Sequence, residues 1–235
     1  MELTPDATIV LDLGWLRLNA TIVNTWIVMA VLTGLSWLVT RSLDPNKPPG
    51  RWRNALEVLV QLIEGQIADV AHRGVRPVMY FAGTLFLFIA ASNTLSVIPG
   101  FKSPTGSLST TAALTLAVLL AVPLFGVAHG GARQYLHKFI EPSILILPFN
   151  VIGELSKAVS LSIRLYGNVM SGAVIAAILL GVAPFFFPVV MDLFGLLVGL
   201  IQAYIFAILA AVYISAAMAE SSPAPHPNKP MEDTL

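Results

Sequence analysis

The chain has 235 residues, of which 56% are apolar and only 11% are charged. Soluble domains carry about 25% charged residues, so this composition indicates an integral membrane protein. The 13 basic and 13 acidic residues balance, which argues against nucleic-acid binding, and the absence of cysteine excludes disulfides, iron–sulfur clusters and thiolate zinc sites.

The first membrane span is predicted after an acidic N-terminal segment, residues 1–20, which lacks the basic n-region of a signal peptide. Residues 21–39 form an apolar run long enough to cross a bilayer core of about 30 Å. A Pro-rich basic loop follows, and residues 54–70 then repeat apolar side chains at helical spacing with acidic residues between them. We predict an amphipathic helix at the membrane surface there, although an amphipathic helix packed on protein fits the same pattern.

Two further spans are predicted over residues 78–98 and 110–127, and the loop between them, 101–109, is rich in turn formers. The loops on either side of this pair carry most of the basic residues, whereas residues 1–20 and 101–109 carry few. The positive-inside rule then predicts about five crossings, with the N-terminus outside and the C-terminus cytoplasmic.

The last two predicted helices, 144–182 and 184–218, are unusually long. A perpendicular span needs only about 20 residues, and we interpret the excess as strong tilt. The tail, 220–235, is polar, Pro-rich and predicted to be disordered. The sequence therefore predicts an all-α integral membrane protein. It forms a single membrane domain, residues 1–235, with about five crossing helices, one surface helix and a tilted hairpin over 144–218.

Arg164 is the most informative single residue, because it lies in an otherwise nearly uncharged part of the chain. A guanidinium cannot lose its proton to escape a low dielectric, and burying it at mid-membrane costs roughly 2.5–3.5 kcal/mol on insertion scales. On a helical wheel it shares an arc of about 120° with other polar side chains. These are Glu154, Lys157, Ser160, Asn168 and Ser171.

The last helix has a matching side formed by Asp192, Gly195, Gly199 and Gln202. With the turn centred near residue 183, Arg164 and Gln202 are expected at the same level of the hairpin. A structural interpretation remains open for each polar residue. Glu154 and Lys157 can neutralise one another, Gln202 can be an interhelical hydrogen bond, and Arg164 can pair with a carboxylate of this chain. The few nearby acids favour a carboxylate on another polypeptide.

Three stretches together resemble subunit a of the F-type ATP synthase, the stator part of its membrane ion channel. They are SKAVSLSIRLYGNVMSG (156–172), LIQAYIFAILAAVYIS (200–215) and NTLSVIPGFKSPTGSLSTTAAL (93–114). The resemblance implies an ion-translocating subunit with two offset half-channels. Its two long tilted helices would face a rotating ring of c subunits.

By match of motif, Arg164 is the essential arginine, which would face the carboxylate of each passing c subunit. Asn168 and Gln202 would be polar neighbours on the path, and Ser160 and Ser171 would help to hydrate it. The resemblance further implies b subunits of a peripheral stalk, an indirect link to the F1 sector, and a bacterial plasma (inner) membrane. The complete set of predicted ion-path residues is Arg164, Asn168, Gln202, Ser160, Ser171, Glu154, Asp192 and Asn93.

The chain departs from the family where acidic or histidine side chains are common. Those positions hold Ala173, Gly195 and Ser96, so the usual proton-relay groups are missing, and Asp192 is a candidate substitute. A path without relays would pass protons through water or hydrated sodium ions.

No catalytic site is predicted in this chain. It lacks a GxxxxGK[ST] nucleotide loop, and its four histidines have no metal-ligand spacing, so we expect neither a nucleotide site, a metal nor a cofactor. A stand-alone secondary transporter whose arginine binds an anionic substrate is the competing function. It predicts an internal repeat, which the sequence does not show.

Overall fold

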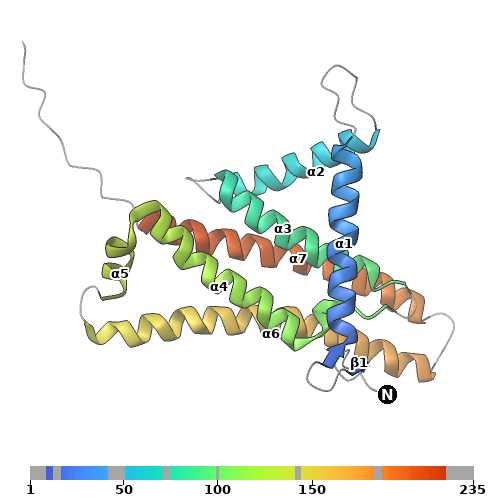
Figure 1. The fold of residues 1–235 in the computed structure, drawn as a ribbon. Coiled ribbons are helices and arrows are strands. Elements are labelled where there is room, and N and C mark those ends of the chain that lie inside the picture. The colour runs from blue at the N-terminus through green and yellow to red at the C-terminus, as the bar shows by residue number, and fades with distance from the viewer. Residues whose placement is uncertain are drawn as a thin grey trace, which may run out of the picture.

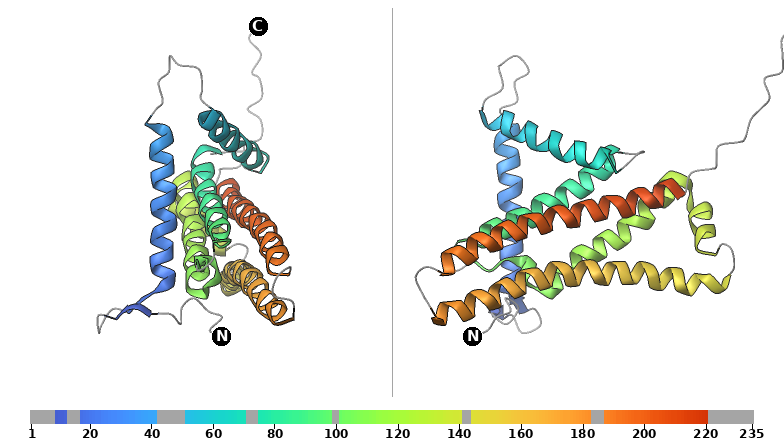
Figure 2. Two further views of the ribbon diagram at one scale, coloured as in Figure 1. Left: turned by 90° about the vertical axis from the view of Figure 1, so that its right-hand side faces the viewer. Right: turned by 180° about the vertical axis from the view of Figure 1, so that it is seen from behind.

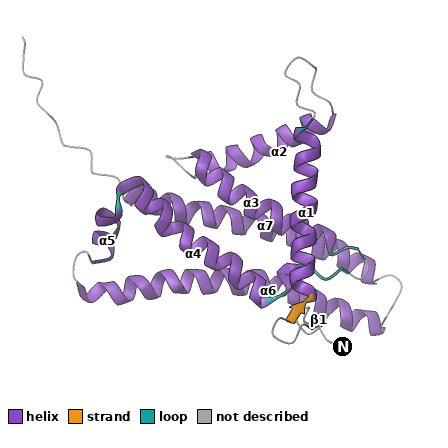
Figure 3. Cartoon of the chain, in the orientation of Figure 1, coloured by secondary structure: helices purple, strands orange, loops and turns teal. Residues whose placement is uncertain are grey.

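The computed structural model describes residues 9–12, 17–41, 51–70, 75–98, 101–140, 144–182 and 187–220. This part of the chain is helical except for a short antiparallel pair of strands, β1 (Ile9–Asp12) and β2 (Arg17–Asn19) (Figure 3). The helices are α1 (Ala20–Thr40), α2 (Arg51–Ala68), α3 (Val75–Leu95), α4 (Leu108–Gly130), α5 (Ala132–Ile140), α6 (Leu147–Val182) and α7 (Phe187–Glu220), with short 3-10 turns η2 (Pro104–Gly106) and η3 (Ile144–Ile146).

Five of these helices, α1, α3, α4, α6 and α7, are long and apolar enough to cross a membrane. This confirms the predicted number of spans. Helix α2 is the predicted amphipathic helix, and it lies across the end of the bundle (Figure 1). Helix α5 was not predicted, because its short sequence reads as a basic connection.

Helices α6 and α7 contain 36 and 34 residues, or roughly 54 and 51 Å of helix. Both run across the direction of α1 rather than along it (Figure 1). If α1, with 21 residues, crosses the bilayer upright, α6 and α7 must be strongly inclined, as predicted.

Helix α7 is in contact with α3, α4 and α6, and it supplies the largest share of the core. Its buried face is rich in alanine, which lets neighbouring helices approach closely in a lipid environment. Figure 2 shows α1 on one side of the molecule and the α6–α7 pair on the other, with α3 and α4 between them. One face of the α6–α7 pair is therefore not covered by the rest of the described chain. The buried alanines of α7 are Ala203, Ala207, Ala210, Ala211 and Ala217.

The connection between α3 and α4 is buried although its sequence is typical of an exposed loop. Ser103, Thr105 and Ser107 are almost inaccessible, and η2 contacts α1, α3, α4 and α6. The Asn24 amide near the start of α1 donates to the Lys102 carbonyl oxygen at 2.8 Å. The start of α1 and this connection therefore lie on the same side of the molecule, as the predicted topology requires.

Helix α4 ends where Gly131 adopts a positive φ of 84°, a conformation that favours glycine. This turn brings α5 back against α4. A Cβ atom on Gly126 would lie 2.6 Å from Cδ2 of Tyr135, so the α5 ring occupies the space left by the missing side chain. Glycine at this position allows α5 to pack closely on α4.

Candidate functional site

Most residues of the predicted polar face of α6 lie on the side of the helix that the rest of the described chain leaves open. Leu161 and Leu165 are buried in the core, whereas Arg164, Ser160 and Ser171 are exposed. Arg164 lies about 60° around the helix from Leu161 and about 100° from Leu165, so it stands at the edge of the buried side, and its side chain is exposed there. The predicted polar face of α6 is therefore an outer surface of this chain.

Arg164 has no ion pair with any residue that the structure describes. The alternative in which Arg164 pairs with a carboxylate of this chain is thus not supported within the described ranges. The nearest acidic residue along the same face, Glu154, already pairs with Lys157, with 2.9 Å between Nζ and Oε1. The ion pair supports the structural interpretation of Glu154 and Lys157, in which the two charges neutralise one another.

Gln202 is buried, with 6% of its surface exposed, and its amide nitrogen Nε2 has no hydrogen-bond partner. Leu161 and Leu165 share a buried cluster with Ala203 and Phe206, which puts Arg164 and Gln202 at about the same level of the hairpin. Their surroundings nevertheless differ, because the Arg164 side chain is exposed and the Gln202 side chain is in the core. Within the described residues, Nε2 of Gln202 therefore makes no interhelical hydrogen bond, which is the structural role that the sequence left open for this residue.

Asn93 connects α3, α7 and the buried connection through both ends of its amide. Its Nδ2 donates to the Gly199 carbonyl oxygen at 2.8 Å, and its Oδ1 accepts from the Thr105 hydroxyl at 2.8 Å. Thr105 in turn is 2.7 Å from the Ser103 hydroxyl. Asn93 is therefore held in one orientation, against Gly199, which lies about one turn before Gln202 on α7.

Sequence reasoning missed a set of buried hydroxyl groups on α4 and α6. Ser162 lies 3.4 Å from the Thr111 hydroxyl across the α4–α6 contact, and both side chains are buried. Thr115 is buried as well, and its hydroxyl has no hydrogen-bond partner. The run of small polar residues at the start of α4 was the available signal, but it was interpreted only as part of an apolar span.

The side of α7 predicted to face α6 changes character along its length. Asp192 and Gly195 are exposed, whereas Gly199 and Gln202 are buried. On α6, Asn168 is half-buried, and its carbonyl oxygen accepts from the Ser171 hydroxyl at 3.1 Å. Only the second half of the predicted α7 face, Gly199 and Gln202, therefore belongs to the core.

A second polar group lies where α5, α6 and α7 meet. The Lys157 ammonium sits 5.5 Å from the centre of the Tyr213 ring, within range of a cation–π interaction. On α5, burial and then the negative charge of Glu154 raise the pKa of Tyr135 above its usual value. The described residues contain no group of three or more His, Asp or Glu side chains that could hold a metal ion.

The chain matches the family described as ATP synthase A chain over residues 22–215. It is 55% identical to "ATP synthase subunit a 2" of Acaryochloris marina, over 92% of this chain and 93% of that protein. It is 51% identical to "ATP synthase subunit a" of Albidiferax ferrireducens, over 97% of this chain and 99% of the relative. A third relative, "ATP synthase subunit a 1" of Chlorobaculum parvum, is 50% identical over 92% of this chain and 96% of its own length.

Proposed function

The chain belongs to the ATP synthase subunit a family of the membrane F0 sector, and from this premise we propose that it is the ion-translocating stator subunit of a rotary ATP synthase. In this proposal, Arg164 faces the carboxylate of each passing c subunit. Two offset half-channels admit and release the ion, so that proton or sodium flow is coupled to ring rotation and to ATP synthesis or hydrolysis. The chain is an integral multi-pass membrane protein, and the chemistry of ATP takes place elsewhere in the complex.

The observation that carries the proposal is the exposed, unpaired position of Arg164 among the described residues, on a polar face of a membrane helix. Within a bilayer such a face must meet protein or water. A carboxylate on a neighbouring polypeptide satisfies the charge. At about 4 Å the attraction is roughly 4 kcal/mol at an effective dielectric of 20, which favours the ionised carboxylate and still permits release. Arginine suits this role because it stays charged at any relevant pH.

The buried polar residues between α3, α4, α6 and α7 support an outer half-channel. Asn93, Thr105, Thr111 and Ser162 form hydrogen bonds there, and the unpartnered Nε2 of Gln202 can donate a hydrogen bond to water. The Ser103–Thr105 connection lies on the same side as the start of α1, the side that the positive-inside rule assigns to the outside.

The proposed path has no acidic or histidine relay at Ala173 and Gly195, which are exposed. Hydroxyl and amide groups can order water or donate oxygen ligands to sodium, whereas they do not exchange protons near neutral pH. Asp192, exposed near the start of α7, is the proposed titratable substitute. Along α6, we propose that Ser160, Asn168 and Ser171 hydrate the path, with Glu154 at its inner end.

The proposed partners are a c ring over the open face of α6 and α7, b subunits of the peripheral stalk, and, indirectly, the F1 sector. The segment 144–218 would then be the hairpin facing the ring, residues 1–20 an outer segment, and 220–235 a cytoplasmic tail. The proposed location is a bacterial plasma membrane with the N-terminus outside. Most of the tail lies outside the described residues.

Reconstitution of the complex in sealed liposomes tests the function. ATP-driven acidification and radioactive sodium uptake would be followed side by side in preparations with the natural chain and with Arg164→Ala. We expect ATP-dependent uptake of one ion, lost in the variant while the c ring and stalk subunits still co-purify. Undiminished pumping by Arg164→Ala would contradict the proposal. Purification of this chain without those subunits would favour the secondary transporter.

A further inference from the structure

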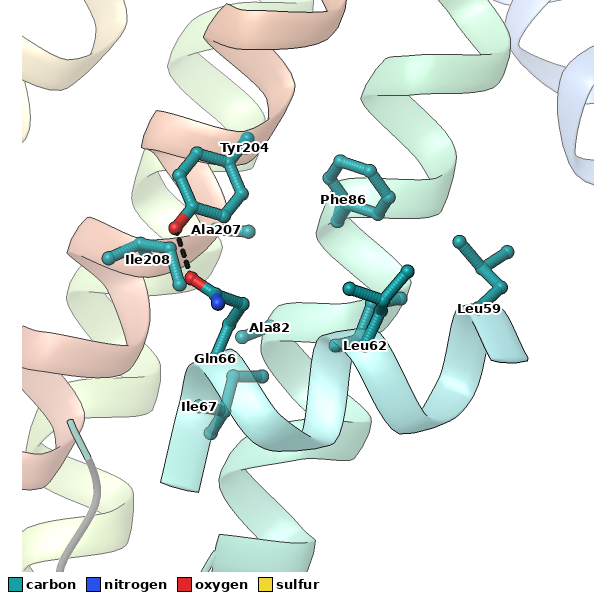
Figure 4. Close-up of a pocket in the computed structure, with 10 residues that line it drawn as sticks. Leu59, Leu62, Gln66, Ile67, Ala82, Phe86, Tyr204, Ala207 and Ile208 are labelled. Atoms are coloured by element: carbon teal, nitrogen blue, oxygen red, sulfur yellow. Dashed lines mark hydrogen bonds between the residues drawn. The ribbon is translucent and has the colours of Figure 1, made fainter. Parts of the chain in front are cut away.

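A groove lies where α2 crosses α3 and α7, and its lining is almost entirely apolar (Figure 4). Its volume is about 390 Å³. Its floor is formed by buried residues of all three helices, Ile67, Ala82 and Ala207. Its rim is open, because Leu62 is 59% and Tyr204 is 43% exposed. Leu59, Ile63, Gln66, Phe86 and Ile208 complete the lining.

The two polar side chains of the groove satisfy one another. The Tyr204 hydroxyl donates to Oε1 of Gln66, which links α7 to α2 at one end of the groove (Figure 4). No charged side chain lines the groove. Bound water needs two to four polar partners, and a phosphate or a carboxylate needs a cation or several donors. The lining therefore selects a hydrocarbon.

We propose that this groove binds one acyl chain of a membrane phospholipid and thereby fixes α2 against α3 and α7. Two of its walls, α3 and α7, are membrane-spanning helices, whose outer surfaces meet lipid tails. On α2, the exposed apolar residues Leu56 and Val60 lie on the same side of the helix as the lining residues. In a bilayer these apolar surfaces favour hydrocarbon over water at the mouth of the groove, and an acyl chain that enters it removes the apolar lining from contact with water.

A helix of a partner subunit fits the groove less well. An α-helix with its side chains is about 10–12 Å across, so a cavity of about 390 Å³ would hold only a short length of it. An acyl chain is thin and flexible enough to enter between Leu62 and Tyr204. Because no charged group lines the groove, retention should depend on the chain and not on the headgroup. This inference needs only the membrane location, and it holds whichever ion the complex carries.

The experiment uses the intact complex in vesicles containing a phospholipid with a photoactivatable diazirine in its acyl chain, as phosphatidylglycerol or as phosphatidylcholine. After illumination, labelled peptides are mapped by mass spectrometry. We expect label on residues 59–67 and 204–208 with both headgroups. Ala207→Phe, which fills the floor, should lower that label at least several-fold. Ala216→Phe, at an exposed alanine of the same helix, should leave it unchanged.

A second variant acts in the opposite direction. Leu62→Ala widens the mouth and should keep or increase the label. The unfolding temperature of the Ala207→Phe complex is measured beside its label, and we expect the label to fall while the unfolding temperature stays that of the natural complex. Equal labelling of the natural chain and Ala207→Phe would overturn the proposal. A cross-link from an Ala207→Cys variant to a c subunit would overturn it too. That cross-link is readily assigned within this chain, which has no cysteine of its own.

Discussion

Asn93 and Gly199 form a hydrogen-bonded pair that a larger residue at position 199 would crowd. The Asn93 Nδ2 donates to the Gly199 carbonyl oxygen at 2.8 Å, and a Cβ on Gly199 would lie 3.0 Å from both Cβ and Nδ2 of Asn93. The pair holds α7 against α3 one turn before Gln202. Asn93 therefore has a structural role that the sequence interpretation, which placed it on the ion path, did not include.

This fit predicts a compensating pair of substitutions. Gly199→Ala should destabilise the chain by about 1–3 kcal/mol through overpacking. Asn93→Ala should cost a similar amount, because the buried Thr105 hydroxyl and Gly199 carbonyl lose a partner. The double variant removes the close contacts with Cγ and Nδ2 and keeps the one with Cβ, so the overcrowding is partly relieved and the loss should be smaller than the sum by about 0.5 kcal/mol or more. Thermal unfolding of the purified complexes measures this, and strictly additive losses would show that the contact is not tight.

The unpaired charge at position 164 predicts a strict requirement for coupling. Arg164→Ala should abolish ATP-driven ion uptake, while assembly with the c ring and the stalk stays intact because the side chain is exposed and not part of the core. Lys157→Ala is the matched control, since it removes another exposed cation of the same face whose carboxylate partner is present in this chain. Exposed ion pairs contribute about 0–1 kcal/mol, so this control should retain most of the pumping. Equal losses in both variants would mean that general positive charge, and not Arg164, is needed.

The sequence predicted the number of spans, the surface helix and the long hairpin, because each depends on the length and period of an apolar pattern. It also predicted the exposed polar face of α6, since a helical wheel fixes which residues share a side. It did not predict that 103–107 would be buried, because serine, threonine, glycine and proline are typical of exposed turns. The Asn93–Gly199 fit and the hydroxyl contacts of Thr111 with Ser162 depend on tertiary packing, which no local pattern encodes.

Tyr135 predicts a loss of stability at alkaline pH. Its pKa is raised by burial and by Glu154, so the unfolded chain ionises this phenol at a lower pH than the folded chain. The contribution of the neutral Tyr135 phenol to the free energy of unfolding is fully present below a pH of about 10 and is lost as the pH rises through the folded-state pKa. Tyr135→Phe should flatten this part of the stability curve. The free energy of unfolding would be measured between pH of about 9 and about 12 for the natural chain and Tyr135→Phe. Tyr80→Phe, at an exposed tyrosine, is the control. An identical alkaline slope in the natural chain and Tyr135→Phe would contradict the assignment.

The unpartnered amide of Gln202 predicts opposite effects on stability and on transport. A buried amide nitrogen without a hydrogen bond costs about 1–3 kcal/mol, so Gln202→Leu should leave the complex as stable as before or more stable. If that nitrogen donates to water on the ion path, the same change should lower the rate of ion uptake severalfold without abolishing it. Unfolding temperature and ATP-driven uptake, measured on the same preparation, separate the two effects. An unchanged uptake rate would leave Gln202 with a packing role only, whereas a fall in both quantities would indicate a lost structural hydrogen bond.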